Sequence, residues 1–239
     1  MEALNRLATL LCPWVLPWRC LLCADAGAQG VDLCPACIAE FPRNTHCCAR
    51  CALPLPLSAP LCGQCQRKAP QWDAAWAPFR YAWPLDRLET RFKFGRDLAA
   101  GRVLSTLWER EAQRLLLPKL IVPVPLHTQR LRERGYNQSF ELAKPLARAL
   151  NVPCRHDVLL RVRHTGAQTI LNATERRRNL NAAFALHEGI ELPPHVALLD
   201  DVFTTGATLA ECTKVLKRAG VTRVVSWQNS YNEFGYSYH

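Results

Sequence analysis

Two sets of paired cysteines near the start of the chain have the residue types and spacing of metal sites. Each set contains two CxxC turns separated by ten residues, and each member of the second set follows its counterpart by 28 positions. The eight residues are Cys20, Cys23, Cys34, Cys37, Cys48, Cys51, Cys62 and Cys65. A CxxC turn presents two thiolates to one ion, and two turns complete a tetrahedral all-cysteine zinc site with no open catalytic position. The sequence therefore predicts two structural zinc ions.

These eight thiolates allow more than one arrangement. We expect sequential ribbons, in which the first four cysteines bind one ion and the last four bind the other, but an interleaved pairing uses the same residues. Disulfide bonds are the alternative to zinc, and they need an oxidising compartment. His46 and Cys47 fall outside the repeat and are expected not to be ligands. The remaining cysteines are expected to be buried thiols: Cys12, Cys154 and Cys212.

A second group of residues, near the C-terminus, has the types that bind a phosphorylated sugar. Asp200 and Asp201 end an apolar run, and a loop follows after two residues: Thr204, Thr205, Gly206, Ala207 and Thr208. Glycine permits a tight turn, while backbone N–H groups and threonine hydroxyls can surround a phosphate at a helix N-terminus. Adjacent carboxylates accept hydrogen bonds from sugar hydroxyls or hold a magnesium ion, directly or through water. A capped helix without a ligand is the alternative interpretation.

A parallel sheet would position these residues. Residues 195–199 form an apolar strand before the acids, the apolar face of 209–219 indicates a helix, and 221–227 indicate another strand. Strand, loop, helix and strand in this order form a βαβ unit, whose ligands bind at the carboxyl ends of the strands.

The preceding segments supply the rest of an α/β scaffold. Residues 119–125 indicate a buried strand, 82–117 are helical around Gly95, and a helix is expected over 137–150, although Pro145 is a residue that interrupts helices. A length of 239 residues fits a medium domain with a small module, and the concentration of cysteine before residue 66 places the boundary near Ala69-Pro70.

The formal charge of +10 indicates an anionic partner. A polyphosphate sugar and a nucleic-acid strand both qualify, and a solvated basic face is the alternative. The N-terminal apolar run from Leu7 to Trp18 imitates a secretory signal, but cleavage after Ala28 would discard Cys20 and Cys23. We therefore expect a short N-terminal arm and a cytoplasmic protein that is not an integral membrane protein.

The acid pair and the following loop closely match the signature with which type I phosphoribosyltransferases bind phosphoribosyl pyrophosphate (PRPP). The segment from Val122 to His127, Arg130, and the run from Arg134 to Ser139 resemble the ComF family, also called ComFC or GntX-like proteins. That family places a double zinc ribbon before a phosphoribosyltransferase domain. The resemblance implies an N-terminal arm (1–17), a double zinc ribbon (18–69), an α/β phosphoribosyltransferase domain with a mainly parallel sheet (70–228) and a C-terminal tail (229–239).

The resemblance also implies roles for individual residues. Asp200, Asp201 and Arg163 would be catalytic, and the threonine–glycine loop would bind PRPP. Further PRPP-binding residues would come from the pyrophosphate loop and the residues after it: Pro125, Leu126, His127, Arg130 and Arg134. Arg163 begins a segment, continuing through His164, Thr165, Gln168 and 176–179, that is similar to the mobile catalytic loop of amidophosphoribosyltransferases.

The expected function is magnesium-dependent transfer of a phosphoribosyl group from PRPP to an unidentified acceptor. The alternative is a non-catalytic protein that handles single-stranded DNA or docks to another competence protein, since the family resemblance implies DNA uptake and use. These functions are compatible. The sequence contains no P-loop motif, GxxxxGK[ST], so ATP-driven movement of DNA by this chain is not expected.

Overall fold

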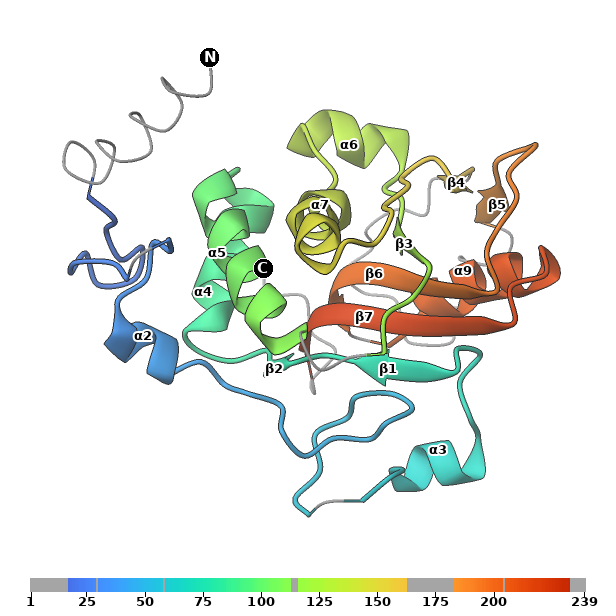
Figure 1. Ribbon diagram of the computed structural model, residues 1–239, viewed down its shortest axis with the longest axis horizontal. Coiled ribbons are helices and arrows are strands. Elements are labelled where there is room, and N and C mark those ends of the chain that lie inside the picture. The colour runs from blue at the N-terminus through green and yellow to red at the C-terminus, as the bar shows by residue number, and fades with distance from the viewer. Residues whose placement is uncertain are drawn as a thin grey trace.

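A five-stranded parallel sheet forms the centre of the protein (Figure 1). The computed structural model describes residues 17–28, 30–57, 59–112, 116–162, 183–203 and 205–232. The strands are β1 (Ala74–Trp76), β2 (Phe79–Arg80), β3 (Leu120–Pro123), β6 (His195–Phe203) and β7 (Arg223–Tyr231). Their order is β1-β7-β6-β3, and β2 also pairs with β7. All of these pairings are parallel, which confirms the expected α/β class.

Helices cover both faces of this sheet. One face packs against α4 (Leu85–Phe94), α5 (Leu98–Ala112) and α7 (Gln138–Leu150). The other packs against α9 (Ala207–Arg218) and a separate antiparallel pair, β4 (Leu159–Arg161) and β5 (Phe184–Leu186). Side chains of a strand alternate between faces, so Ala197 and Leu199 of β6 face the first group while Val196 and Leu198 face the second. Burial on both faces explains the continuous apolar runs in the sequence.

The two central strands are longer than the sequence indicated. β6 extends through Asp200 and Asp201 to Phe203, and β7 extends to Tyr231, with Phe203 and Tyr231 in register. Three residues expected in the C-terminal tail, 229–231, are therefore part of the sheet. The apolar run ends at Trp227, but the polar side chains that follow it are also buried. Hydrophobic periodicity does not detect a strand whose last residues line a polar interior.

The helical segment before the sheet divides where the sequence indicated. α4 ends at Gly95, and the Asp97 carboxylate accepts hydrogen bonds from the N–H groups of Ala99 and Ala100 at the start of α5. α7 continues through Pro145, which costs one backbone hydrogen bond, and it buries Leu142 and Leu146 against the core. Tertiary packing therefore outweighs the local preference against a proline within the helix.

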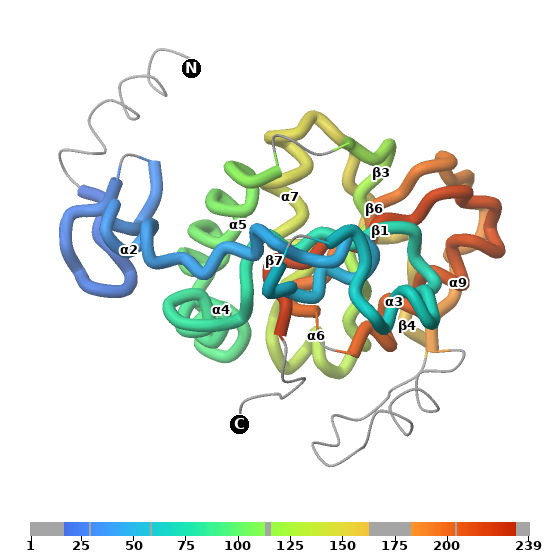
Figure 2. The backbone as a smooth tube through the Cα atoms, turned by 90° about the horizontal axis from the view of Figure 1, so that it is seen from below, coloured from blue at the N-terminus to red at the C-terminus, as the bar shows by residue number. Residues whose placement is uncertain are grey.

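The two cysteine-bearing segments contact different parts of the α/β domain. The first contains the short helix α2 (Pro35–Ala39). Its residues Leu33 and Phe41 belong to the same hydrophobic core as the buried side chains of α4 and α5. The second contains α3 (Gly63–Arg67) and lies next to β1, apart from α2 (Figure 2). Among the described helices, none has both the length and the apolar character needed to cross a membrane. The predicted arm, apart from residue 17, and the tail after residue 232 lie outside the described residues.

Candidate functional site

The cysteine sulfurs form two groups with the geometry of tetrahedral metal sites. The first comprises Cys20, Cys23, Cys34 and Cys37, and the second comprises Cys48, Cys51, Cys62 and Cys65. Within each group all ligand atoms lie within 4.8 Å of one another. These are the sequential ribbons that the sequence favoured. His46, Cys47, Cys154 and Cys212 lie outside both groups, whereas Cys12 is outside the described residues.

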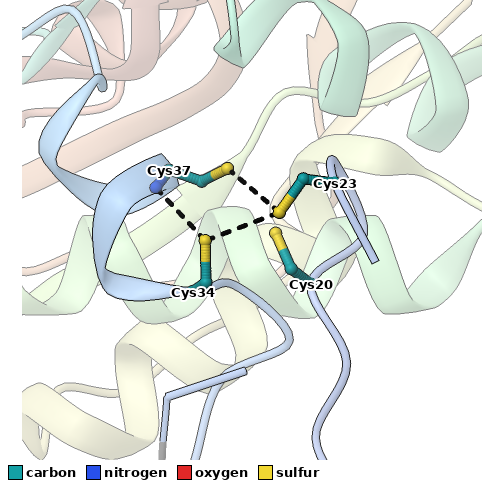
Figure 3. A group of neighbouring side chains, drawn as sticks. All are labelled: Cys20, Cys23, Cys34 and Cys37. Atoms are coloured by element: carbon teal, nitrogen blue, oxygen red, sulfur yellow. Dashed lines mark hydrogen bonds between the residues drawn. The ribbon is translucent and has the colours of Figure 1, made fainter. Parts of the chain in front are cut away.

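Figure 3 shows the four thiols of the first group converging on a common centre. The Cys23 sulfur lies 3.6 Å from that of Cys34 and 3.7 Å from that of Cys37. Two sulfurs bound tetrahedrally to one zinc ion are about 3.8 Å apart, so these distances fit zinc. The N–H group of Cys37 donates to the Cys34 sulfur at 3.4 Å and starts α2. Cys62 and Cys65 repeat that contact at the start of α3, also at 3.4 Å.

The electrostatics of the thiols also favour a bound cation. Burial raises the pKa of Cys48, but backbone N–H groups from Cys62, Arg50 and Cys51 outweigh burial and lower the pKa to about 7. Burial instead raises the pKa of Cys65 to about 12. Four adjacent thiolates repel one another, and a dication removes that repulsion by binding all four. The donor set and its spacing thus support two structural zinc ions.

The carboxylates of Asp200 and Asp201 lie near the end of β6 in different surroundings. Asp200 Oδ1 accepts hydrogen bonds from the Ser139 hydroxyl at 2.9 Å and from the N–H group of Asp201 at 3.0 Å. Asp201 forms an ion pair with Lys93 of α4, with Oδ2 and Nζ 3.1 Å apart. The two acids thus contact different helices, Asp200 through Ser139 of α7 and Asp201 through Lys93 of α4.

Lys93 connects Asp201 to a second, completely buried acid. Its ammonium group lies 3.1 Å from Glu89 Oε2, and Glu89 Oε1 accepts a hydrogen bond of 2.8 Å from the Asn229 amide. Glu89 is 0% exposed. A charge buried in this way is stable when it is paired and hydrogen-bonded. The network therefore fixes α4 against both β6 and β7.

The surroundings of the two aspartates shift their pKa values in opposite directions. Burial and then the charge of Asp201 raise the pKa of Asp200 to about 7. Burial would also raise the pKa of Asp201, but the Lys93 ammonium outweighs it and holds that pKa below its usual value. Burial raises the pKa of Glu89. Burial would lower the pKa of Lys93, but its two carboxylate partners outweigh burial and raise it. One aspartate is thus ionised throughout the neutral range, and the other changes charge near neutral pH.

The threonine–glycine loop turns the chain from β6 into α9. Gly206 has a left-handed backbone conformation with φ of 68°, and α9 begins at Ala207. The Thr205 hydroxyl accepts a hydrogen bond of 3.4 Å from the N–H group of Ala207. Backbone N–H groups at this helix N-terminus are the donors that a phosphate requires. Thr204 lies outside the described residues.

The loop after β3 leads into α6 (Thr128–Arg134), which carries the two arginines that are expected from the sequence to bind PRPP. His127 caps this helix, with its Nδ1 atom accepting from the N–H group of Gln129 at 3.2 Å. Arg130 and Arg134 are four residues apart and half-buried. Burial and then the neighbouring guanidinium of Arg134 lower the pKa of Arg130. Two cations close enough to repel in this way indicate a site with an affinity for anions.

The run after α6 connects it to the acid pair. The Tyr136 hydroxyl donates to the backbone oxygen of Phe92, and the Asn137 amide donates to the backbone oxygen of Val124 at 3.0 Å. Asn137 also caps α7, which places Ser139 beside Asp200. This run therefore positions the acids as well as the helix.

Comparisons with known proteins agree with this arrangement. The family model for the double zinc ribbon domain matches residues 11–66. Competence protein F of Haemophilus influenzae is 38% identical over 222 residues, which cover 88% of this chain and 95% of that protein. The chain belongs to the ComF family.

Two further relatives extend the comparison. DNA utilization protein YhgH of Escherichia coli (strain K12) is 36% identical to this ComF protein over 221 residues, or 89% of this chain and 95% of the relative. Competence protein ComFC of Streptococcus pneumoniae is 28% identical over 148 residues, or 62% of this chain and 64% of the relative.

Several residues of the ComF site were not predicted from the sequence. Glu89 and Lys93 had been attributed to scaffold, although Glu89 shares an apolar helix face with Leu85, Leu88 and Phe92, and an acid in that position is a signal of a paired interior charge. Arg161 was not singled out from the sequence either. Burial and then Arg130 lower its pKa, so it belongs to the same positive cluster. Arg163 and the proposed mobile loop lie outside the described residues.

The zinc assignment predicts the metal content of cysteine variants. Wild-type protein should contain two zinc ions per chain, and Cys20→Ser and Cys65→Ser should each lose one because a closed site needs all four thiolates. Cys47→Ser is the matched control and should retain both ions. Elemental analysis of the purified proteins measures the difference. Loss of zinc from Cys47→Ser, or full retention in Cys65→Ser, would contradict the assignment.

The charge network predicts a large effect of Lys93→Met on stability. Removal of the ammonium leaves Glu89 and Asp201 without their cation, which should lower the free energy of unfolding by about 3–5 kcal/mol. Urea denaturation measures this change. In the double variant Lys93→Met/Glu89→Gln, removal of the Glu89 charge should restore part of the lost stability. Lys119→Met, at an exposed position, is the control and should have little effect. Equal stabilities of Lys93→Met and Lys119→Met would show that the network is not stabilising.

Proposed function

We propose that this ComF protein binds PRPP with magnesium and transfers the phosphoribosyl group to an unidentified acceptor. The observation that carries the proposal is the position of Asp200 and Asp201 near the end of β6, a few residues before the glycine turn that opens α9. In parallel α/β folds, ligands bind at this end of the strands. The carboxylates would accept hydrogen bonds from the ribose hydroxyls, and the N–H groups of residues 205–208 would hold the 5-phosphate.

The remaining groups suit the pyrophosphate and its metal. Arg130 and Arg134 would neutralise the diphosphate, since guanidinium groups bind phosphate oxygens through paired donors. Magnesium prefers oxygen ligands and keeps several waters, which suits a carboxylate beside a diphosphate. Asp200 fits this role better than Asp201, because Lys93 already neutralises the latter. The metal, when bound, would stabilise the negative charge that develops on pyrophosphate.

The proposed transfer needs no covalent intermediate. A nucleophilic atom of the acceptor forms a bond to the anomeric carbon, while the bond from that carbon to the pyrophosphate oxygen breaks and its electron pair leaves with pyrophosphate. The acceptor gives up its proton to the surrounding solvent. The arginines would face the leaving group and lower the barrier electrostatically. By the family resemblance, Arg163 would act from a loop that closes over the sugar and excludes water.

DNA handling is the second candidate function. The formal charge of +10 and the names of the relatives, competence protein and DNA utilization protein, favour it. Zinc ribbons and arginines can bind phosphates of a single strand or dock to a competence protein. The two functions differ in the role of the acid pair. Asp201→Asn should disable PRPP binding while leaving salt-sensitive binding of a fluorescent oligonucleotide almost unchanged.

Calorimetry with PRPP tests the first function. Wild-type protein should bind PRPP in the presence of magnesium, and Asp201→Asn should weaken binding about tenfold or more, because a charged hydrogen-bond acceptor becomes neutral. The exposed variant Asp157→Asn is the control and should bind normally. Acceptor-dependent release of pyrophosphate in the same samples would establish transfer. If folded, zinc-loaded wild-type protein does not bind PRPP at millimolar concentration, the proposal is wrong.

The pKa of Asp200 predicts how binding depends on pH. The carboxylate must be ionised to hold magnesium, so PRPP affinity should rise with pH through about 7 and fall as Asp200 becomes protonated below it. Asp200→Asn should bind weakly at every pH and lose this part of the dependence, while ionisation of PRPP itself affects both proteins equally. Calorimetric titrations across this range measure the difference. Parallel pH profiles for the two proteins would contradict the assigned role.

A further inference from the structure

Trp72 lies between the second cysteine group and the phosphate loop. Its side chain is 4% exposed, and its indole N–H group donates a hydrogen bond of 2.7 Å to the backbone oxygen of Arg50. Arg50 lies within the CxxC turn formed by Cys48 and Cys51. The indole is therefore attached to the backbone of a metal-binding turn.

The side chain of Arg50 holds the backbone on both sides of Trp72. Its guanidinium group donates to the Asp73 oxygen at 2.7 Å and to the Pro70 oxygen at 3.4 Å. The Asp73 carboxylate accepts hydrogen bonds from Lys217, near the end of α9, at 2.6 Å and from the N–H group of Val224 at 2.8 Å. Trp72 thus has anchors in the cysteine turn, in α9 and in β7.

The indole ring rests against the glycine of the phosphate loop. A β-carbon added to Gly206 would lie 2.6 Å from Trp72 Cη2, closer than real β-carbon contacts, and 3.1 Å from Phe203 Cζ, which is tighter than most of them. The rings of Trp72 and Phe203 contact edge to face with centroids 5.7 Å apart. These two rings define the space in which the left-handed turn at Gly206 fits. This turn at Gly206 sets the direction of the N–H groups at the start of α9.

Metal binding makes the anchor rigid. The turn from Cys48 to Cys51 belongs to a short unit with few large apolar side chains, whose fold depends on its ion. A cavity of about 800 Å³ beside Trp72 is lined both by that unit, through Cys51 and Cys65, and by the loop, through Thr205 and Gly206. The ring therefore contacts the second cysteine unit and the loop beside this cavity.

We propose that Trp72 is a positioning residue for the phosphate loop and that an intact second cysteine site sets the affinity of the loop for a sugar 5-phosphate. The inference rests on the proposed PRPP site. The chain of contacts runs from the thiolate cluster through the Arg50 carbonyl and the indole to Gly206. The pyrophosphate side of the site, on α6, is not part of this chain, and its affinity for pyrophosphate should not depend on Trp72.

Two ligands, each representing one half of PRPP, test this inference by calorimetry. Ribose 5-phosphate tests the loop, and magnesium pyrophosphate tests the arginine side. Trp72→Leu should weaken binding of ribose 5-phosphate and PRPP about 10- to 100-fold, since small displacements of binding groups have effects of this size. Its affinity for magnesium pyrophosphate and its zinc content should match the wild type. Trp72→Phe keeps a ring but loses the N–H donor and should have a smaller effect.

Two further variants complete the experiment. Trp83 is 55% exposed, and Trp83→Leu should bind both ligands normally. Cys51→Ser/Cys65→Ser should lose one zinc ion and reproduce the selective loss of ribose 5-phosphate binding while Trp72 is intact.

Three results would overturn the inference. They are normal binding of ribose 5-phosphate by Trp72→Leu, equal loss of both ligands, and normal binding of ribose 5-phosphate by the double cysteine variant. Failure of the wild type to bind either ligand is a different outcome, because it would overturn the proposed function and this inference with it.

Discussion

The buried ammonium group of Lys93 balances negative charge at the carboxyl end of the sheet. It contacts Glu89 within its own helix and Asp201 on β6, while Asn229 of β7 holds the other oxygen of Glu89. A third carboxylate, Asp200, lies in the same region, where burial and then the charge of Asp201 raise its pKa to about 7. An arrangement of this kind is costly for a purely structural interior and suited to a site that accepts sugar hydroxyls or a cation.

Both cysteine units are connected to the elements that form this site. The first is held by Arg91, two residues before Lys93 on α4. The Arg91 guanidinium donates to the Leu21 oxygen at 2.5 Å and pairs with Asp97 at 2.6 Å. The second reaches the phosphate loop through Trp72. The zinc ribbons of this ComF protein are thus part of the scaffold on both sides of the site. We therefore expect metal binding to contribute to the geometry of the site as well as to the stability of the N-terminal segment.

The spacing of the cysteines and the periodicity of the apolar residues were sufficient to predict much of the fold. The CxxC repeat predicted the eight ligands, because ligand spacing is a local property, and it favoured the sequential pairing without excluding an interleaved one. The apolar runs predicted the parallel sheet. The partners of the acids were not predictable in this way. Glu89, Ser139 and Asn229 reach the site from three different elements, and only tertiary packing brings them together. The strand ends were misplaced for the same reason, since Asn229 and Ser230 are polar residues in a buried strand. Trp72 gave no sequence signal, because its role depends on a contact with Gly206, 134 positions later.

A crystal structure of the zinc-loaded protein with magnesium and PRPP tests the central claim most directly. The account predicts electron density for the 5-phosphate at the N–H groups of residues 205–208, for the ribose hydroxyls at Asp200 and Asp201, and for pyrophosphate facing Arg130 and Arg134. Zinc should occupy both cysteine groups in the same crystals. Density for PRPP at a different place on the protein, or its absence from crystals grown with millimolar ligand, would contradict the assignment of the end of β6 as a sugar-phosphate site.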